Sequence, residues 1–341
     1  MRKKALITGL TGQDGSYLAE LLVKKGYEVY GLVRRTSTDP FDRFRSIPSV
    51  LAEVNILTGN VQDQTSIERA IKESKPDEVY NLAAQSDVAV SFVCPEETQD
   101  VNYLGVRRVF DAALKINPEV RLYQASTSEM FGATRPPQNE NSAFQPLSPY
   151  ASAKNDAHRD FVIKYREALG AYVASGFLFN HESPRRGLNF VTRKITHGLA
   201  KIKLGQQSYL ELGNLDAKRD WGYAGDYVNA MWMMLQQNKP EDFVIATGES
   251  RTVREFVEAT CRVLDMNVIW EGVGLGEKLL DRQTGRVIVS INKDLFRPQE
   301  VDYLLGDASK AQRVLGWRPS VSFDALVQMM AQNDYDTLHS R

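Results

Sequence analysis

Two pairs of side chains within residues 121–154 have the types and spacing needed for proton transfer. Tyr150 and Lys154 are four residues apart, so on a helix they lie on the same face. Thr127 and Glu129 are two residues apart, so on an extended segment they point to the same side. An unperturbed tyrosine keeps its proton up to about pH 10, but a nearby lysine favours the phenolate. Tyr150 is therefore a candidate general base, and Glu129 is a candidate second one.

A glycine-rich segment near the start of the chain predicts the cofactor that such a pair would use. Residues 4–8 are expected to form a buried strand, and leucines at helical spacing follow from Leu18. A strand, a glycine-rich turn and a helix in this order are typical of a dinucleotide site, because the backbone can approach the pyrophosphate at the helix N-terminus. The residues of this turn that we expect to bind the cofactor are Gly9, Thr11, Gly12, Gln13, Asp14 and Gly15.

The end of the next predicted strand, residues 28–33, indicates which dinucleotide binds. An acidic residue at this position holds the ribose hydroxyls of NAD, whereas an arginine suits the 2′-phosphate of NADP. Arg34 and Arg35 stand here, so we predict NADP, with both arginines as phosphate ligands. Further cofactor contacts are expected after the following strands, at Asn60, Val61, Leu82, Ala83, Ala84 and Ser86.

The order of the predicted elements indicates an α/β fold with a Rossmann-type, doubly wound parallel sheet. Strands expected at 4–8, 28–33, 55–59, 78–84, 121–126 and 171–179 alternate with helical segments. Ligands bind such sheets at the carboxyl ends of the strands, which is where Thr127 lies. We predict an NADP-binding domain of residues 1–180, to which 220–250 return. A smaller, discontinuous α/β substrate-binding lobe would comprise 181–219 and 251–341.

The composition excludes several classes of protein. The chain has 341 residues, of which 43% are hydrophobic and 25% charged, with a formal net charge of −1, so no global field favours nucleic acid or membrane partners. No apolar run is long enough to cross a bilayer. Two cysteines fit a reducing compartment, and we expect a cytoplasmic protein. The four histidines lack ligand spacing, so no metal is expected: His158, His181, His197 and His339.

Five short runs carry a resemblance to a known family. They are residues 11–15, 82–86, 125–132, 179–187 and 216–221. Over nearly its whole length the chain resembles the extended short-chain dehydrogenase/reductase family, and within it the GDP-mannose 4,6-dehydratases. The resemblance implies a lyase with internal redox that converts GDP-mannose to GDP-4-keto-6-deoxymannose. Hydride would pass from sugar C4 to NADP+ and return to C6, so that the cofactor is regenerated.

The same resemblance implies a role for each candidate residue. Tyr150 would take the proton of the sugar 4-hydroxyl, Thr127 would bond to the 4-oxygen, and Glu129 would remove the C5 proton and help water leave from C6. Lys154, His181 and Arg186 would contact the cofactor. Basic residues would bind the diphosphate, since guanidinium binds phosphate bidentately; which of them reach the substrate and which reach NADP stays open. The substrate contacts would be Ser86, Ser128, Asn180, Arg193, Lys194, Arg219, Arg297 and Glu300.

The chain departs from the family pattern in places that leave the sugar and the subunit contacts open. Asp87 stands where the family usually has histidine, and Asn60-Val61 replaces an Asp-Leu pair. The segment after Lys154 is more charged than expected and one residue longer before Tyr165. The resemblance implies a homodimer or homotetramer, with the loop at Arg34 as one possible contact.

Three other functions stay open at this point. One is a dehydratase acting on a GDP-manno-heptose. Another is a nucleotide-sugar reductase or epimerase that uses NADPH, which Glu129 argues against because a plain reductase needs no second base. The third is an NADP-binding sensor without activity, which the intact catalytic set argues against.

Overall fold

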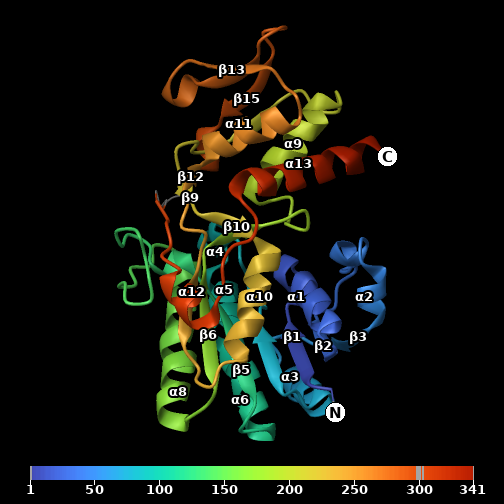
Figure 1. The fold of residues 1–341 in the computed structure, drawn as a ribbon, viewed down its shortest axis with the longest axis vertical. Coiled ribbons are helices and arrows are strands. Elements are labelled where there is room, and N and C mark those ends of the chain that lie inside the picture. Colours follow the sequence, from blue (N-terminus) through green and yellow to red (C-terminus); the bar gives the residue numbers. More distant parts are fainter. Residues whose placement is uncertain (1, 297–300, 302, 341) are drawn as a thin grey trace. The chain divides into compact units, whose positions relative to one another are not determined.

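The computed structural model describes residues 2–296, 301 and 303–340, and its contacts divide the chain into two units (Figure 1). Unit 1 is Met1–Phe179, Ala224–Ile245 and Gly306–Arg318; unit 2 is Asn180–Tyr223, Ala246–Leu305 and Pro319–Arg341. This division differs from the predicted one at Gly306–Arg318, which we had expected in the smaller lobe. The physical reason is local packing: Trp317 is buried against Tyr227 of unit 1 and donates to the carbonyl of Asp226 at 2.8 Å.

Unit 1 contains the doubly wound parallel sheet that the sequence predicts. Its seven strands lie in the order β11-β6-β5-β4-β1-β2-β3, and every neighbouring pair is parallel. In register, Thr8 at the end of β1 lies opposite Leu32 and Asn81, so the carboxyl ends of the central strands align. The strands are β1 Lys4–Thr8, β2 Glu28–Val33, β3 Val54–Thr58, β4 Glu78–Asn81, β5 Arg121–Thr127, β6 Val173–Leu178 and β11 Asp242–Ile245.

Helices cover both faces of this sheet, because its strands are apolar on both sides. Along β1, Ala5 and Ile7 enter one buried cluster while Leu6 enters another. The first cluster is formed with α1 Gln13–Lys24, α2 Pro48–Ala52, α10 Ala224–Leu235 and α12 Ser309–Leu315. The second is formed with α3 Gln64–Ser74, α6 Gly105–Ile116 and the long helix that starts at Pro149. Two short helices, α4 Val88–Val93 and α5 Pro95–Gln99, follow β4.

The long helix from Pro149 to Leu169 changes its winding in the middle. It consists of α7 Pro149–Ala157, a π-helical segment η4 His158–Ile163, and α8 Lys164–Leu169. A π-helical turn bonds over five residues and so admits one more residue than an α-helical turn. The segment before Tyr165, where the resemblance implies one additional residue, contains this π-helical turn. A second π-helical segment, η2 Asp100–Leu104, precedes α6, and Tyr103 on it donates to Asp160 on η4 at 3.1 Å.

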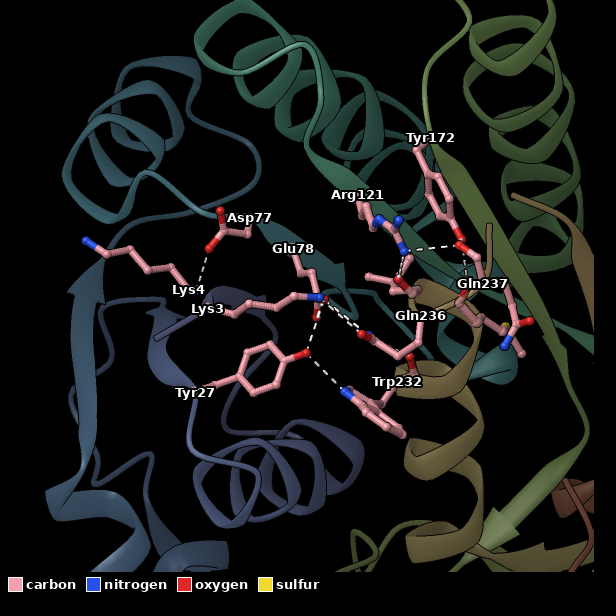
Figure 2. Close-up of polar contacts among 12 residues, drawn as sticks. Lys3, Lys4, Tyr27, Asp77, Glu78, Arg121, Tyr172, Trp232, Gln236 and Gln237 are labelled. Atoms are coloured by element: carbon pink, nitrogen blue, oxygen red, sulfur yellow. Dashed lines mark hydrogen bonds and ion pairs between the residues drawn. The ribbon is translucent and has the colours of Figure 1, made fainter. Parts of the chain in front are cut away.

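A buried carboxylate joins several elements at the start of β4 (Figure 2). Glu78 is fully buried, and its Oε1 accepts from Lys3 Nζ at 3.0 Å, Tyr27 OH at 3.1 Å and Gln236 Nε2 at 3.1 Å. Its Oε2 accepts from Tyr80 OH at 2.8 Å. Burial, with the nearby Glu78 carboxylate, raises the pKa of Tyr27 to about 12. This network ties α10 to the amino end of the sheet, away from the strand ends where ligands bind.

Unit 2 is a smaller α/β unit with its own apolar core. Trp221, Phe256 and Phe323 pack together at its centre. Thr252 caps the helix α11 Val253–Val263, and Glu255 completes a capping box. The other helices are α9 Val191–Lys203 and α13 Phe323–His339. The strands are β7 Asn180–Glu182 with β10 Trp221–Tyr223, β9 Lys218–Arg219 with β12 Arg251–Thr252, and a sheet of β13 Val268–Glu271, β14 Lys278–Asp281, β15 Val287–Ile291 and β8 Leu210–Leu212.

Candidate active site

The glycine-rich turn between β1 and α1 forms a narrow cradle of backbone. Gly9 has a φ of +72°, and a Cβ on it would lie 2.8 Å from the amide nitrogen of Ala83. A Cβ on Gly15 would lie 2.3 Å from the carbonyl oxygen of Gly9. Gly12 is the N-cap of α1 and brings no capping side chain. These contacts require glycine and leave backbone at the start of a helix, which fits the pyrophosphate of a dinucleotide.

Two neighbours of the turn fix its shape. Arg43 donates from Nη1 to the carbonyl of Thr11 at 3.0 Å, and Gln13 Nε2 donates to Asp14 Oδ1 at 3.1 Å. Sequence reasoning missed Arg43, because it lies in a short 3-10 helix, η1 Asp42–Phe44, with no periodic pattern to mark it. Arg34 and Arg35 follow β2 directly, are both exposed, and pair with no carboxylate among the described residues.

The residues predicted after β3 and β4 lie at the same ends of the sheet. Thr8 accepts from the amides of Leu82 and Ala83, each at 3.1 Å, and donates to Asn81 Oδ1 at 2.7 Å. This holds the chain after β4 over the end of β1, where Leu82, Ala83 and Ala84 are partly exposed and Ser86 is exposed. After β3, Val61 is buried, while Asn60 accepts from the amide of Gln62 at 3.1 Å.

Asp87, the most prominent departure from the family pattern, has a structural role. Its carboxylate accepts from the amides of Ala89 and Val90 and so caps α4. Aspartate is among the residues preferred at this position, because a helix begins with unpaired amide groups. The substitution is thus explained by helix capping and does not itself indicate a different substrate.

Thr127 and Glu129 lie together at the end of β5. The Thr127 side chain is nearly buried, and its Oγ1 accepts from the amide of Glu129 at 3.2 Å, which caps the 3-10 helix η3 Ser128–Met130. The Thr127 hydroxyl proton is left to be donated elsewhere. The Glu129 side chain is half-buried, and its carboxylate has no hydrogen-bond or ion-pair partner within the described part of the chain. Ser128 between them is buried.

Tyr150 and Lys154 lie on the first turns of α7, which packs against β5 and η3. Ser148 caps this helix by accepting from the amide of Ala151 at 3.1 Å. Both Tyr150 and Lys154 are buried, and Lys154 Nζ donates to the carbonyl oxygen of Ala125 on β5 at 2.8 Å. Burial lowers the pKa of the Lys154 amine to about 8. Lys154 thus contacts β5, the strand that ends at Thr127, just before Glu129.

In unit 2, two of the predicted ligands keep polar groups available. Asn180 on β7 has a buried side-chain oxygen with no hydrogen-bond partner among the described residues. Lys194 on α9 is half-buried and likewise pairs with no described carboxylate. Arg219 on β9 is buried and donates to the carbonyl of Lys218 at 2.9 Å, and His181 is half-buried on β7. Arg297 and Glu300 lie outside the described residues.

Two predicted arginines are engaged within unit 2. Arg193 pairs with Asp334 at 2.6 Å and donates to the carbonyls of Arg186 at 2.9 Å and of Pro184. Its guanidinium therefore joins α9, α13 and the preceding loop, and its role as a substrate ligand stays a prediction. Arg186 pairs with Glu182 at 3.2 Å and stacks over the ring of Phe190 at 3.6 Å.

A buried aspartate in unit 2 escaped sequence reasoning. Asp220 is fully buried and accepts from the amide of Thr247 at 2.8 Å, from its hydroxyl at 2.6 Å, and from the amide of Gly248 at 2.9 Å. Its place beside Arg219 was the available signal, but an aspartate next to an arginine is common on surfaces.

Within the described ranges no helix has the length and apolar character to cross a bilayer, and no cluster of three or more acidic, histidine or cysteine side chains is placed to hold a metal ion.

Known proteins resemble this chain in sequence and in fold. A GDP-mannose 4,6 dehydratase of Drosophila melanogaster is 52% identical over 98% of this chain and 87% of that protein. Among solved structures, UDP-glucose 4-epimerase of Thermotoga maritima, with UDP-glucose, has a TM-score of 0.82 at 21% identity, covering 98% of this chain and 99% of that one. RMD of Pseudomonas aeruginosa, complexed with NADPH, has a TM-score of 0.76 at 20% identity, covering 98% and 100%. The profile of the GDP-mannose 4,6 dehydratases matches residues 6–330, and the chain belongs to that family of hydro-lyases.

Proposed function

We propose that this protein converts GDP-mannose to GDP-4-keto-6-deoxymannose, with Thr127, Glu129, Tyr150 and Lys154 as its catalytic residues. The observation that carries the proposal is the arrangement at the end of β5. There a half-buried Glu129 carboxylate, which has no partner among the described residues, follows Thr127. Lys154 of the tyrosine helix reaches the carbonyl of Ala125 on the same strand. Oxidation alone needs one base, whereas elimination of water needs a second, and Glu129 is available for it.

The cofactor proposed for this site is NADP. When bound, it accepts hydride from sugar C4 and returns it to C6, so that it is not consumed. Gly9, Gly12 and Gly15 would hold its pyrophosphate, because backbone lies too close to Gly9 and Gly15 for a side chain and tightly against Gly12. Arg34 and Arg35 support NADP over NAD, since both are exposed after β2 and pair with no described carboxylate.

The first proton transfer involves Tyr150, Thr127 and Lys154. Thr127 Oγ1 already accepts from the amide of Glu129, so its own proton can be donated to the sugar 4-oxygen. Tyr150 removes the proton of the 4-hydroxyl as the bond from C4 to hydrogen breaks. With a pKa of about 8, Lys154 is mostly an ammonium at neutral pH, and this charge one helical turn away favours the phenolate.

Elimination then depends on Glu129. The 4-keto group acidifies the C5 proton, which the Glu129 carboxylate removes. The electron pair left at C5 forms the C5–C6 double bond as the C6 hydroxyl leaves. The proton now on Glu129 passes to that hydroxyl, which departs as water, and the carboxylate is restored. The return of hydride to C6 would require a proton at C5, and the proton that Tyr150 took from the 4-hydroxyl would supply it, which would restore the phenolate. A carboxylate without an internal partner suits this cycle, because no hydrogen bond or ion pair must break when it is protonated.

The remaining contacts are proposed from the polar residues that the resemblance implies. Ser86 and Ser128 in unit 1 and Asn180, Lys194 and Arg219 in unit 2 are proposed to bind the GDP-sugar. His181 and Arg186 are proposed to contact the cofactor. A homodimer or homotetramer in the cytoplasm is proposed as well, and the free thiols Cys94 and Cys261 support a reducing compartment.

The test is incubation of the purified protein with GDP-mannose, without added cofactor and then with NADP+, read by mass spectrometry. We expect a product lighter by one water and no net change in the absorbance of reduced nicotinamide. If only a GDP-manno-heptose is converted, the protein is a dehydratase of that sugar instead. If NADPH is lost steadily during turnover, the protein is a nucleotide-sugar reductase instead. No conversion of any of these would leave only the family and the fold.

The role of Glu129 is tested with Glu129→Gln and, as a control, Glu119→Gln at an exposed surface position. Glu129→Gln should still bind cofactor and substrate but form no dehydrated product, because an amide cannot remove the C5 proton. Glu119→Gln should behave like the natural chain. Full dehydratase activity in Glu129→Gln would show that another group is the second base.

A further inference from the structure

The segment that joins the two catalytic pairs has no helix or strand of its own. This connecting loop, residues 131–148, runs from the end of η3 to the start of α7. Near η3 its two arms are joined, since Gln145 donates from its amide to the carbonyl of Met130 at 3.0 Å. Gly132 has a φ of +50°, and a Cβ on it would lie 1.8 Å from the Gln145 oxygen. A displacement of the loop would therefore be transmitted to both of its ends.

The far end of the loop is held by one carboxylate. Glu140 accepts through Oε1 from the amide of Val244 at 2.7 Å. Val244 is fully buried in β11, which is an edge strand of the seven-stranded sheet. One side of an edge strand has no neighbouring strand to accept its amides, and a buried amide without an acceptor is costly. Glu140 supplies that acceptor and fastens the loop to the sheet at the same point.

A second set of contacts fastens the loop to the segment 306–312. Gln138 is fully buried, its carbonyl accepts from the amide of Asp307 at 2.8 Å, and its side chain donates to the carbonyl of Thr134 at 2.9 Å. Lys310 pairs with Glu241 at 2.8 Å, just before β11. At this edge Glu140 is the loop residue that bonds to the sheet, and Gln138 holds the loop to the segment 306–312. Closer to η3 and α7, the rings of Phe131 and Phe144 pack against Phe177 of β6.

A carboxyl oxygen of Glu140 makes the contact with the Val244 amide. Burial raises the pKa of the Glu140 carboxyl, the hydrogen bond from Val244 opposes this rise, and so does the nearby Lys310, while Asp307 adds to it. A neutral amide of the same length keeps the accepting oxygen. Glutamine is therefore a matched replacement, whereas alanine removes the contact and leaves the Val244 amide without its acceptor.

We propose that Glu140 is a positioning residue, which anchors the connecting loop to edge strand β11 and so fixes the placement of Glu129 relative to Tyr150. This inference rests on the proposed roles of those two residues. Glu140 touches neither of them; it acts through the loop that ends at η3 on one side and at the Ser148 cap of α7 on the other. A misplacement of reacting groups by about 1 Å can lower a rate by about a hundredfold, so a loosened loop should affect kcat more than substrate binding.

The test compares Glu140→Ala, Glu140→Asp and Glu140→Gln in the full-length protein. We expect Glu140→Ala to lower kcat for GDP-mannose by about tenfold to a hundredfold with KM within about threefold, and Glu140→Gln to stay within about threefold of the natural chain in both. Glu140→Asp, which is too short to reach Val244, should follow Glu140→Ala and carries the test if the alanine variant does not fold. Amide hydrogen exchange should rise in 131–148 and at Val244 in the Ala and Asp variants alone.

The outcomes separate this inference from the proposed function. An inactive natural chain would refute the proposed function, and hydrogen exchange would still decide whether Glu140 anchors the loop. An active natural chain with unchanged kcat in Glu140→Ala would refute the positioning role. Equal losses in Glu140→Gln and Glu140→Ala would also refute it, because they would assign the effect to the charge.

Discussion

The buried lysine of the catalytic helix should make the protein less stable than it could be. Lys154 is buried, and its pKa is lowered from 10.5 to about 8. A pKa that is about 2.5 units lower in the folded chain corresponds to about 3 kcal/mol of lost stability below pH 8. Replacing the lysine by methionine removes this cost, but it also removes the hydrogen bond to the Ala125 carbonyl, which is worth about 1–3 kcal/mol. Lys154→Met should therefore gain up to about 2 kcal/mol near neutral pH and lose catalytic activity.

The sign of the pH dependence gives a sharper test than the net value. Because the folded pKa lies below the unfolded one, the natural chain carries the full penalty below about pH 8 and loses it as the pH rises toward 10.5. From about pH 7 to about pH 9 the natural chain should gain about 1 kcal/mol relative to Lys154→Met.

The measurement is the free energy of unfolding from urea titrations at both pH values, without added nucleotide. Lys72→Met, at an exposed position on α3, serves as the control and should show no such slope relative to the natural chain. A difference between the natural chain and Lys154→Met that stays constant from pH 7 to pH 9 would refute the reasoning. So would a slope of the opposite sign.

Three other changes test separate parts of the structure. Arg35→Ala should weaken NADP binding by about tenfold or more while NAD binding changes little. Calorimetry measures both affinities, with Arg45→Ala as the control; equal losses for both dinucleotides would remove the 2′-phosphate argument. Gly15→Ala should abolish measurable dinucleotide binding, because the added Cβ meets backbone at 2.3 Å, whereas Gly276→Ala adds its Cβ in open space and should bind normally. Glu78→Ala should lower the free energy of unfolding by about 2–4 kcal/mol, since it leaves buried donors unpaired, with kcat unchanged; a variant as stable as the natural chain would contradict the network of Figure 2.

Local signals in the sequence were enough to predict the fold. The strand before Gly9 and the spacing of Tyr150 and Lys154 each depend on residues a few positions apart, and the structure has the expected strand and helix there. Parallel strands that alternate with helices have few possible arrangements, so the sheet followed from these elements. The tyrosine and lysine could be placed at a strand end because ligands bind such sheets at that edge.

Contacts between distant residues could not be predicted in this way. Arg193 was expected to bind phosphate, yet its partner Asp334 lies 141 positions away, and no local pattern marks the pair. The bond from Val244 to Glu140 spans 104 positions, and it depends on β11 being an edge strand, which is known only once the sheet is formed. A charged side chain has the same local signature whether it meets a ligand, solvent or a buried partner.

The π-helical segment has a consequence for how this helix can change in evolution. In a regular α-helix, one inserted residue turns everything after it by about 100°. Here η4 separates two parts of the helix: Lys154, before the segment, reaches β5, and Tyr165, beyond it, donates to Asp111 at 2.5 Å. A π-helical turn can hold one residue more than an α-helical turn without this change of direction. The helix therefore has two halves whose rotational phase is set independently. An insertion in the outer half of the helix therefore need not turn Tyr150 and Lys154 away from the sugar. The outer half can change in sequence while the half that carries these two residues keeps its orientation.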